Sequence, residues 1–160
     1  AVCCLHLGRT GEAKVALTAC MAQRPRFHWN FILRGQAHAL NGDSDKAIED
    51  FQAALAGRPS DATQIVALTE LGMAFWNRGL RRDALAVFGE LTDRFPGQTS
   101  AWLLKGSAEL TVGDRAEATR DFEQALALSP ELPGARLGQT LGFLANAEIW
   151  RWFNFPKTAE

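Results

Sequence analysis

Two ten-residue segments of this chain share most of their residues, and the distance between them constrains the fold more than any other feature of the sequence. The segment DFQAALAGRP begins at Asp50, and the segment DFEQALALSP begins at Asp121, an interval of 71 in the numbering. Six of their ten residues are the same. Recurrence at a long, fixed interval is typical of repeat proteins, in which each repeat is one small structural unit.

A pattern that overlaps these segments recurs four times in the 160 residues. It consists of an alanine, an apolar residue four positions later, and a proline twelve positions after the alanine. The intervals between successive alanines are 34, 37 and 34, so the interval between the two segments is two repeats plus three extra residues. The four sets are Ala13/Leu17/Pro25, Ala47/Phe51/Pro59, Ala84/Phe88/Pro96 and Ala118/Phe122/Pro130.

A glycine five positions before each alanine divides the repeat into two predicted helices. A tight turn between helices often needs a positive φ, which Gly adopts at little cost. Asp43-Ser44-Asp45 and Asp114 follow this glycine and are predicted N-caps of the second helix, which the proline then ends. The turn glycines are Gly8, Gly42, Gly79 and Gly113.

Another glycine lies twelve positions before the alanine in three of the repeats, at Gly35, Gly72 and Gly106. It falls in the middle of the first predicted helix, where Gly costs about 1 kcal/mol relative to Ala. That cost is understandable if a neighbouring helix approaches closely. The alanine of the second helix is the expected opposing surface.

These features resemble the tetratricopeptide repeat, which has a period of about 34 residues and the pattern W-x2-L-G-x2-Y…A-x3-F…P. The stretch from Trp102 to Pro130 fits the pattern, as do the stretches from Leu68 to Pro96 and from Phe31 to Pro59. The resemblance implies an all-α superhelix of about four stacked helix-turn-helix repeats, with the first helix of each repeat lining the concave face. The expected order is a partial repeat at 1–27, a repeat at 28–61, a short insertion at 62–64, repeats at 65–98 and 99–132, a capping helix at 133–147 and an aromatic tail at 148–160.

The three extra residues are Ala62-Thr63-Gln64, which follow Ser60 and Asp61. Because Ser and Asp are good N-cap residues, the favoured interpretation is a tolerated loop or a first helix lengthened by one turn. A functional insert is the alternative.

Two repeats carry polar residues where the family pattern has Leu and an aromatic residue. Arg34 and His38 are four residues apart on one predicted helix, and so are Lys105 and Glu109. In the favoured interpretation their long side chains reach solvent and Lys105 pairs with Glu109, whereas the alternative is a polar contact point for a partner. His38 is not expected to be a catalytic base, because no nucleophile or carboxylate partner is indicated.

The residues expected on the concave face are mostly apolar. Some family members clamp a peptide carboxylate there, but the matching places here hold no Lys or Arg; they are Ile32, Leu33, Gln36, Val66 or Ser100, and Glu70 or Leu104. The expected ligand is therefore an apolar or amphipathic segment of a partner protein, anchored by Trp29, Met73 and Trp76. The alternative is that some of these residues pack between helices. The expected contact residues are Trp29, Ile32, Leu33, Gln36, Val66, Thr69, Glu70, Met73, Trp76, Asn77, Leu103, Ser107 and Thr111.

The segment EIWRWFNFP near the end of the chain has aromatic residues that the repeat pattern does not require. It could extend the capping helix, insert into a groove of its own or of a neighbouring copy, or dock on another protein or a membrane surface. A possible second contact is formed by Trp150, Trp152, Phe153 and Phe155.

Composition argues against several classes of function. The net charge is −1 and the basic residues are scattered, which gives no support to nucleic-acid binding. No apolar run approaches the roughly 20 residues of a membrane span. The three cysteines, Cys3, Cys4 and Cys20, have no metal-site spacing and are expected to be buried thiols, which weakly favours a cytoplasmic compartment.

The sequence therefore predicts a protein-interaction scaffold that is not an enzyme and needs no metal or cofactor. Two alternatives remain open. The chain could be the regulatory arm of a larger enzyme, because its first repeat begins inside a predicted helix. It could also be a structural scaffold that forms homo-oligomers through its repeats and its aromatic tail.

Overall fold

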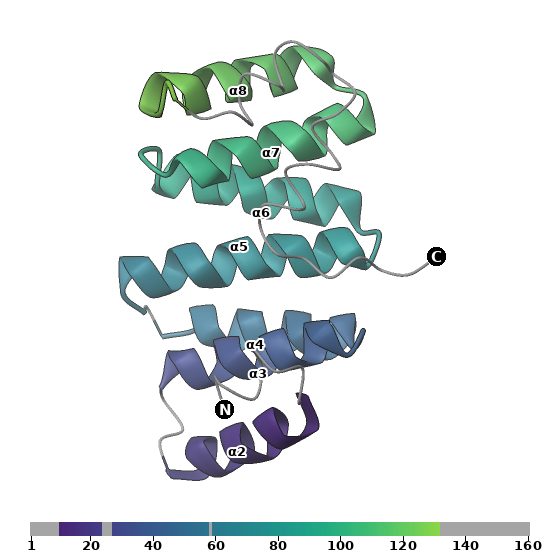
Figure 1. Ribbon diagram of the computed structural model, residues 1–160, viewed down its shortest axis with the longest axis vertical. Coiled ribbons are helices and arrows are strands. Elements are labelled where there is room, and N and C mark those ends of the chain that lie inside the picture. The colour runs from purple at the N-terminus through teal and green to yellow at the C-terminus, as the bar shows by residue number, and fades with distance from the viewer. Residues whose placement is uncertain (1–9, 24–26, 58, 132–160) are drawn as a thin grey trace. The chain divides into compact units, whose positions relative to one another are not determined.

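The computed structural model describes residues 10–23, 27–57 and 59–131. These residues form seven α-helices and no strand, which confirms the all-α fold. The predicted capping helix at 133–147 and the aromatic residues of 148–160 lie outside the described residues. The helices are α2 (Thr10–Gln23), α3 (His28–Leu40), α4 (Ser44–Leu55), α5 (Asp61–Asn77), α6 (Arg81–Arg94), α7 (Thr99–Val112) and α8 (Arg115–Leu128) (Figure 1).

The chain divides into two compact units, Ala1–Val87 and Phe88–Glu160. In the first unit, α2, α3, α4 and α5 contact one another in chain order, and α3 also contacts α5. In the second unit, α7 packs against α8. The recurring apolar residue of the repeat is in the core each time, because Leu17, Phe51, Phe88 and Phe122 are at most 1% exposed.

Three of the four turn glycines have the predicted conformation, with φ of 79° at Gly42, 82° at Gly79 and 95° at Gly113, and Gly8 lies outside the described residues. The predicted cap at Asp114 is also confirmed, since its carboxylate accepts a hydrogen bond from the backbone N–H of Glu117 at 3.3 Å. Asp43 precedes α4 without a side-chain capping bond, and its carboxylate lies 3.4 Å from Nδ1 of His38.

The three extra residues lengthen a helix. α5 has 17 residues, compared with 13 in α3 and 14 in α7. Ser60 caps α5 by accepting a hydrogen bond from the backbone N–H of Thr63, and Gln64 donates from its side chain to the carbonyl of Pro59 at 2.7 Å. Ala62-Thr63-Gln64 therefore form part of the first turns of α5 and not a loop.

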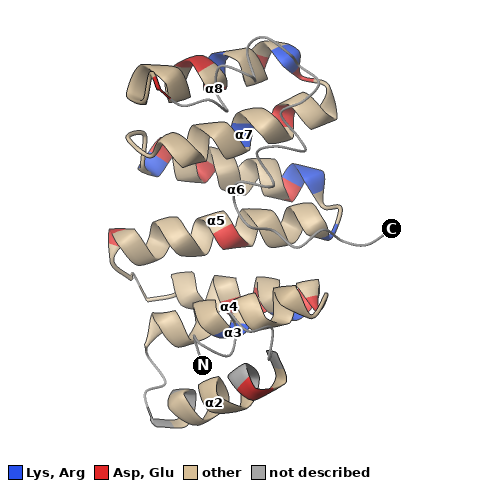
Figure 2. Ribbon diagram, in the orientation of Figure 1, with Lys and Arg blue, Asp and Glu red and all other residues tan. Residues whose placement is uncertain are grey.

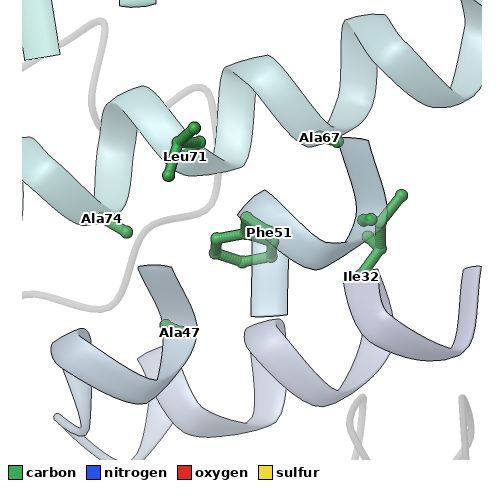
Figure 3. Close-up of a cluster of buried hydrophobic side chains, with 7 residues drawn as sticks. Ile32, Ala47, Phe51, Ala67, Leu71 and Ala74 are labelled. Carbon is green, nitrogen blue, oxygen red and sulfur yellow. The ribbon is translucent and has the colours of Figure 1, made fainter. Parts of the chain in front are cut away.

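The core of the first unit surrounds Phe51 of α4 (Figure 3). A Cβ atom placed on Gly35 would lie 2.6 Å from Cε1 of Phe51 and 2.9 Å from its Cδ1. The mid-helix glycine is therefore explained by the Phe51 ring, whose atoms are the nearest to it, ahead of the expected Ala47. The cluster consists of Ile32, Ala47, Phe51, Ala54, Ala67, Leu71 and Ala74.

The second unit repeats this arrangement with Leu103, Ala118, Phe122 and Ala125. A Cβ atom on Gly106 would lie 3.1 Å from Cε1 of Phe122 and 3.2 Å from the carbonyl oxygen of Ala118. The phenylalanine ring is again the nearest group to the added Cβ atom, and the expected alanine approaches it through its backbone carbonyl.

Cys20 lies exposed on α2 as a free thiol, so the expectation of a buried thiol is wrong for this residue. Cys3 and Cys4 lie outside the described residues. Cys20 therefore does not support the inference of a cytoplasmic compartment, which was drawn from buried cysteines.

Candidate functional site

The first helices of two successive repeats, α3 and α5, contact each other in the first unit. On α3, Trp29, Leu33 and Gln36 are spaced by four and three residues, so they share one side of the helix. On α5, Val66 and Glu70 are four residues apart and share a side in the same way. We use the name α3–α5 face for the members of the predicted set on these helices that remain at least partly exposed, namely Trp29, Leu33, Gln36, Val66, Thr69, Glu70 and Asn77.

Three predicted contact residues of the first unit are buried, which corrects the expectation that their side chains meet solvent. Ile32 is fully buried in the cluster around Phe51. Trp76 is covered by Arg81, whose guanidinium carbon lies 3.9 Å from the ring centroid and whose Nη1 donates to the Trp76 carbonyl at 3.0 Å. Met73 is also buried.

In the second unit, two of the three predicted contact residues are buried as well. Leu103 packs with Phe122, and Ser107 uses its hydroxyl to donate to the carbonyl of Leu103 at 2.7 Å. Thr111 is exposed near the end of α7. The candidate site in this unit is therefore reduced to one of its expected residues.

Trp29 differs from the other tryptophans that the structure describes. Trp76 is stacked under Arg81, and Trp102 donates from its indole nitrogen to the carbonyl of Pro96 at 2.8 Å. Trp29 is 38% exposed and has no hydrogen-bond or cation–π partner among the described residues. Its indole therefore leaves part of a large apolar surface open to solvent.

A hydrogen bond links the two helices of the α3–α5 face. The side-chain amide of Gln36 donates to Oε1 of Glu70 at 2.6 Å. Burial raises the pKa of Glu70 above its ordinary value, and the hydrogen bond from Gln36 opposes that rise only in part. The face therefore contains a partly desolvated carboxylate beside apolar side chains.

The polar residues that replace the family pattern form ion pairs inside the helix pairs. Arg34 of α3 donates from Nε to Oδ2 of Asp50 in α4 at 2.8 Å, and its Nη2 lies 2.5 Å from Oδ1. Lys105 of α7 lies 2.9 Å from Oδ2 of Asp121 in α8 and 3.3 Å from Glu109, which confirms the predicted Lys105–Glu109 pair. The sequence interpretation missed the two aspartates.

The spacing of the repeats could have predicted these two aspartates. The interval from Arg34 to Lys105 is the same as the interval from Asp50 to Asp121. The repeat between them has Leu71 and Val87 at the corresponding positions, and these two side chains join the apolar cluster of the first unit. An acid therefore accompanies a base at these paired positions, and an apolar residue accompanies an apolar residue.

Glu109 occupies a site with two carboxylates and one cation. Burial, followed by the charge of Asp121, raises the pKa of Glu109 to about 7, and Lys105 opposes this shift. Oε2 of Glu109 is buried without a hydrogen bond, whereas Oδ2 of Asp121 is buried 2.9 Å from the Lys105 ammonium nitrogen. The pair of acids is therefore only half neutralised when both are ionised.

Within the described ranges, no group of three or more His, Cys, Asp and Glu residues is placed to hold a metal ion. Among the same residues, no helix has both the length and the apolar character needed to cross a membrane.

Comparisons with known proteins identify the repeat. A family model described as the tetratricopeptide repeat matches residues 5–62 and 69–133. No curated protein matches the chain significantly by sequence.

Solved structures share the fold at low sequence identity. The crystal structure of the MamA protein aligns with a TM-score of 0.72 and 17% identity, covering 92% of this chain and 81% of that chain. The MamA RS-1 ArsTM double mutant aligns with a TM-score of 0.72 and 20% identity, covering 94% and 90%. YrrB, described as a TPR protein with an unusual peptide-binding site, aligns with a TM-score of 0.68 and 14% identity, covering 91% and 74%.

Proposed function

Because the chain belongs to the tetratricopeptide-repeat family, we propose that it is a non-enzymatic protein-interaction module whose α3–α5 face binds an apolar or amphipathic segment of a partner protein. Stacked helical repeats offer extended surfaces for such segments. The partner contact replaces the solvent that now covers part of this face.

The observation that carries this proposal is the partly exposed indole of Trp29, which has no hydrogen-bond or cation–π partner among the described residues. Tryptophan is enriched among the few residues that dominate binding energy, because it buries a large area with little loss of side-chain freedom. Leu33 and Val66 are only half-buried on the same face and extend its apolar surface. The buried Met73 and Trp76 are left out of the contact, since a partner would have to displace neighbouring side chains to reach them.

The test is an affinity capture from lysate of the source cells, read by mass spectrometry, with wild type beside Trp29→Ala. A matched control is Leu128→Ala, which removes another exposed apolar side chain, on α8 of the second unit. Circular dichroism and thermal unfolding verify that both variants keep the helical fold.

We expect a protein that wild type and Leu128→Ala both capture and that Trp29→Ala loses, followed by a drop in measured affinity of roughly 30-fold or more for Trp29→Ala. Capture that is equal for all three proteins would refute this assignment of the site. Capture that depends on Leu128 and not on Trp29 would move the contact to the second unit.

A further inference from the structure

We propose that Glu70 receives a lysine or arginine side chain of the bound segment, so that the partner of the α3–α5 face is a basic amphipathic segment. The inference rests on the proposed function and adds the charge of the partner to it. Three observations carry it: the exceptional pairing of Glu70, the charges of the two helices, and the place of Glu70 relative to Trp29.

Glu70 is the exception among the six acidic residues that the described part of the chain buries wholly or partly. The other five each have a basic side chain within ion-pair distance. Glu70 has only the neutral amide of Gln36, on Oε1, and its Oε2 has no donor among the described residues. The five paired acids are Asp43 with His38, Asp50 with Arg34, Glu109 and Asp121 with Lys105, and Glu117 with Arg120.

The two helices of the face supply no cation for Glu70. α5 contains Asp61 and Glu70 and no Lys or Arg, so in Figure 2 its ribbon shows acidic positions without a basic one between them. α3 contains one arginine, Arg34, and its guanidinium is engaged by Asp50. The charge of the face is therefore negative, and a basic ligand complements it.

Burial makes this carboxylate more receptive to a cation. Desolvation raises the pKa of Glu70 because water that would stabilise its charge has been removed. A neutral amide compensates for that loss less than an ammonium or guanidinium group, since only the cation adds a full opposite charge to its hydrogen bond. An incoming Lys or Arg would donate to the oxygen that Gln36 leaves open.

The place of Glu70 gives the spacing of the ligand groups. Gln36, which holds Glu70, follows Trp29 by seven residues on α3, and seven residues of helix rise about 10 Å. An apolar side chain at Trp29 and a cation at Glu70 are then separated by about three residues in an extended segment or seven in a helical one. The expected ligand pattern is an aromatic or aliphatic residue with Lys or Arg at one of these two distances.

Peptide selection tests the inference without a known partner. A phage-displayed library of random 12-residue peptides is panned separately against wild type, Glu70→Gln and Asp61→Asn. Glu70→Gln keeps a hydrogen-bonding partner for Gln36 while removing the charge. Asp61→Asn changes the net charge by the same amount at an exposed position of the same helix, so it controls for long-range charge effects.

A double-mutant cycle then measures the contact. A synthetic peptide selected by wild type is compared with its copy in which the basic residue is replaced by norleucine. We expect the basic peptide to bind Glu70→Gln roughly 10-fold to 100-fold more weakly than wild type, Asp61→Asn to remain within about twofold, and the norleucine peptide to bind wild type and Glu70→Gln alike.

The outcomes separate this inference from the proposed function. Peptides that require Trp29 but show no enrichment of Lys or Arg, or that bind Glu70→Gln as tightly as wild type, overturn the role of Glu70 and leave the apolar face in place. Selected peptides whose binding survives Trp29→Ala, or no selected peptide at all, overturn the proposed function and this inference with it.

Discussion

Phe51 leaves no room for a side chain at Gly35. The ring is fully buried, and a Cβ atom on Gly35 would lie 2.6 Å from its nearest carbon. We expect Gly35→Ala to destabilise the fold by about 1–2 kcal/mol, because overpacking costs about 1–3 kcal/mol and the better helix propensity of Ala returns up to about 1. The midpoint of thermal or urea unfolding, followed by circular dichroism, measures this change.

Gly89 provides the matched control, since it also lies inside a helix but a Cβ atom placed on it would meet nothing within 4 Å beyond its own helix backbone and chain neighbours. Gly89→Ala is expected to raise the free energy of unfolding by about 0.5–1 kcal/mol through helix propensity alone. If Gly35→Ala gains stability as Gly89→Ala does, the close approach of Phe51 is not what requires the glycine.

At the scale of the helix pair, the ion pair of α3 and α4 occupies the positions that Leu71 and Val87 occupy in the next repeat. Arg34→Leu alone leaves the nearly buried Asp50 without its partner and is expected to cost about 3 kcal/mol. Asp50→Val alone costs less, about 1–2 kcal/mol, because the Arg34 side chain is 29% exposed and can turn toward water.

The double variant Arg34→Leu/Asp50→Val restores a combination that the chain already uses. We expect its free energy of unfolding to lie within about 1 kcal/mol of wild type, as for other buried ion pairs replaced by apolar residues of similar volume. Chemical unfolding of the four proteins completes the cycle. Additive losses in the double variant would show that the two positions do not act as a pair.

The acid pair of α7 and α8 makes the stability of the fold depend on pH. The pKa of Glu109 is raised from 4.5 to about 7, so the folded chain holds a proton that the unfolded chain releases. Because the folded state binds more protons between these values, the free energy of unfolding falls as the pH rises from about 4.5 to about 7. After allowance for partial solvent screening, this contribution is on the order of 1 kcal/mol.

Glu109→Gln removes this titration and keeps the size of the side chain. We expect thermal unfolding of the variant between pH 5 and pH 7.5 to lose part of the decline that wild type shows, with the difference between the two proteins growing toward the higher pH. Parallel pH profiles for the two proteins would mean that Glu109 titrates near its ordinary pKa.

At the scale of the whole chain, the helical repeats could be predicted because their signals are local and recur in register. The turn glycines, the recurring apolar residue and the extra turn of α5 all depend on residues a few positions apart. The resemblance to the tetratricopeptide repeat then added the pairing of the helices. The match of the family model confirms this part of the interpretation.

The candidate site was harder to predict because exposure depends on contacts that the repeat pattern does not encode. Trp76 has the position of a concave-face residue, yet Arg81 from the start of the next helix covers it. Asp50 and Asp121 begin the two similar ten-residue segments, and a shared core would explain that similarity equally well. Their pairing with Arg34 and Lys105 could be predicted only by comparing equivalent positions across the repeats. Trp29 was predicted as an anchor, and its partner contact stays a prediction.

The most direct test of binding at the α3–α5 face is fluorine NMR of the chain labelled with 5-fluorotryptophan, whose five tryptophans give separate signals that single Trp→Phe variants assign. The captured partner protein, or a peptide selected by wild type, is titrated into the labelled chain. We predict that the Trp29 signal shifts or broadens while the signals of Trp76 and Trp102 stay in place, because these two are already engaged within the fold. An unchanged Trp29 signal at saturating ligand would contradict this binding mode, and a shift confined to Trp150 or Trp152 would assign the contact to the aromatic segment at 148–160 instead.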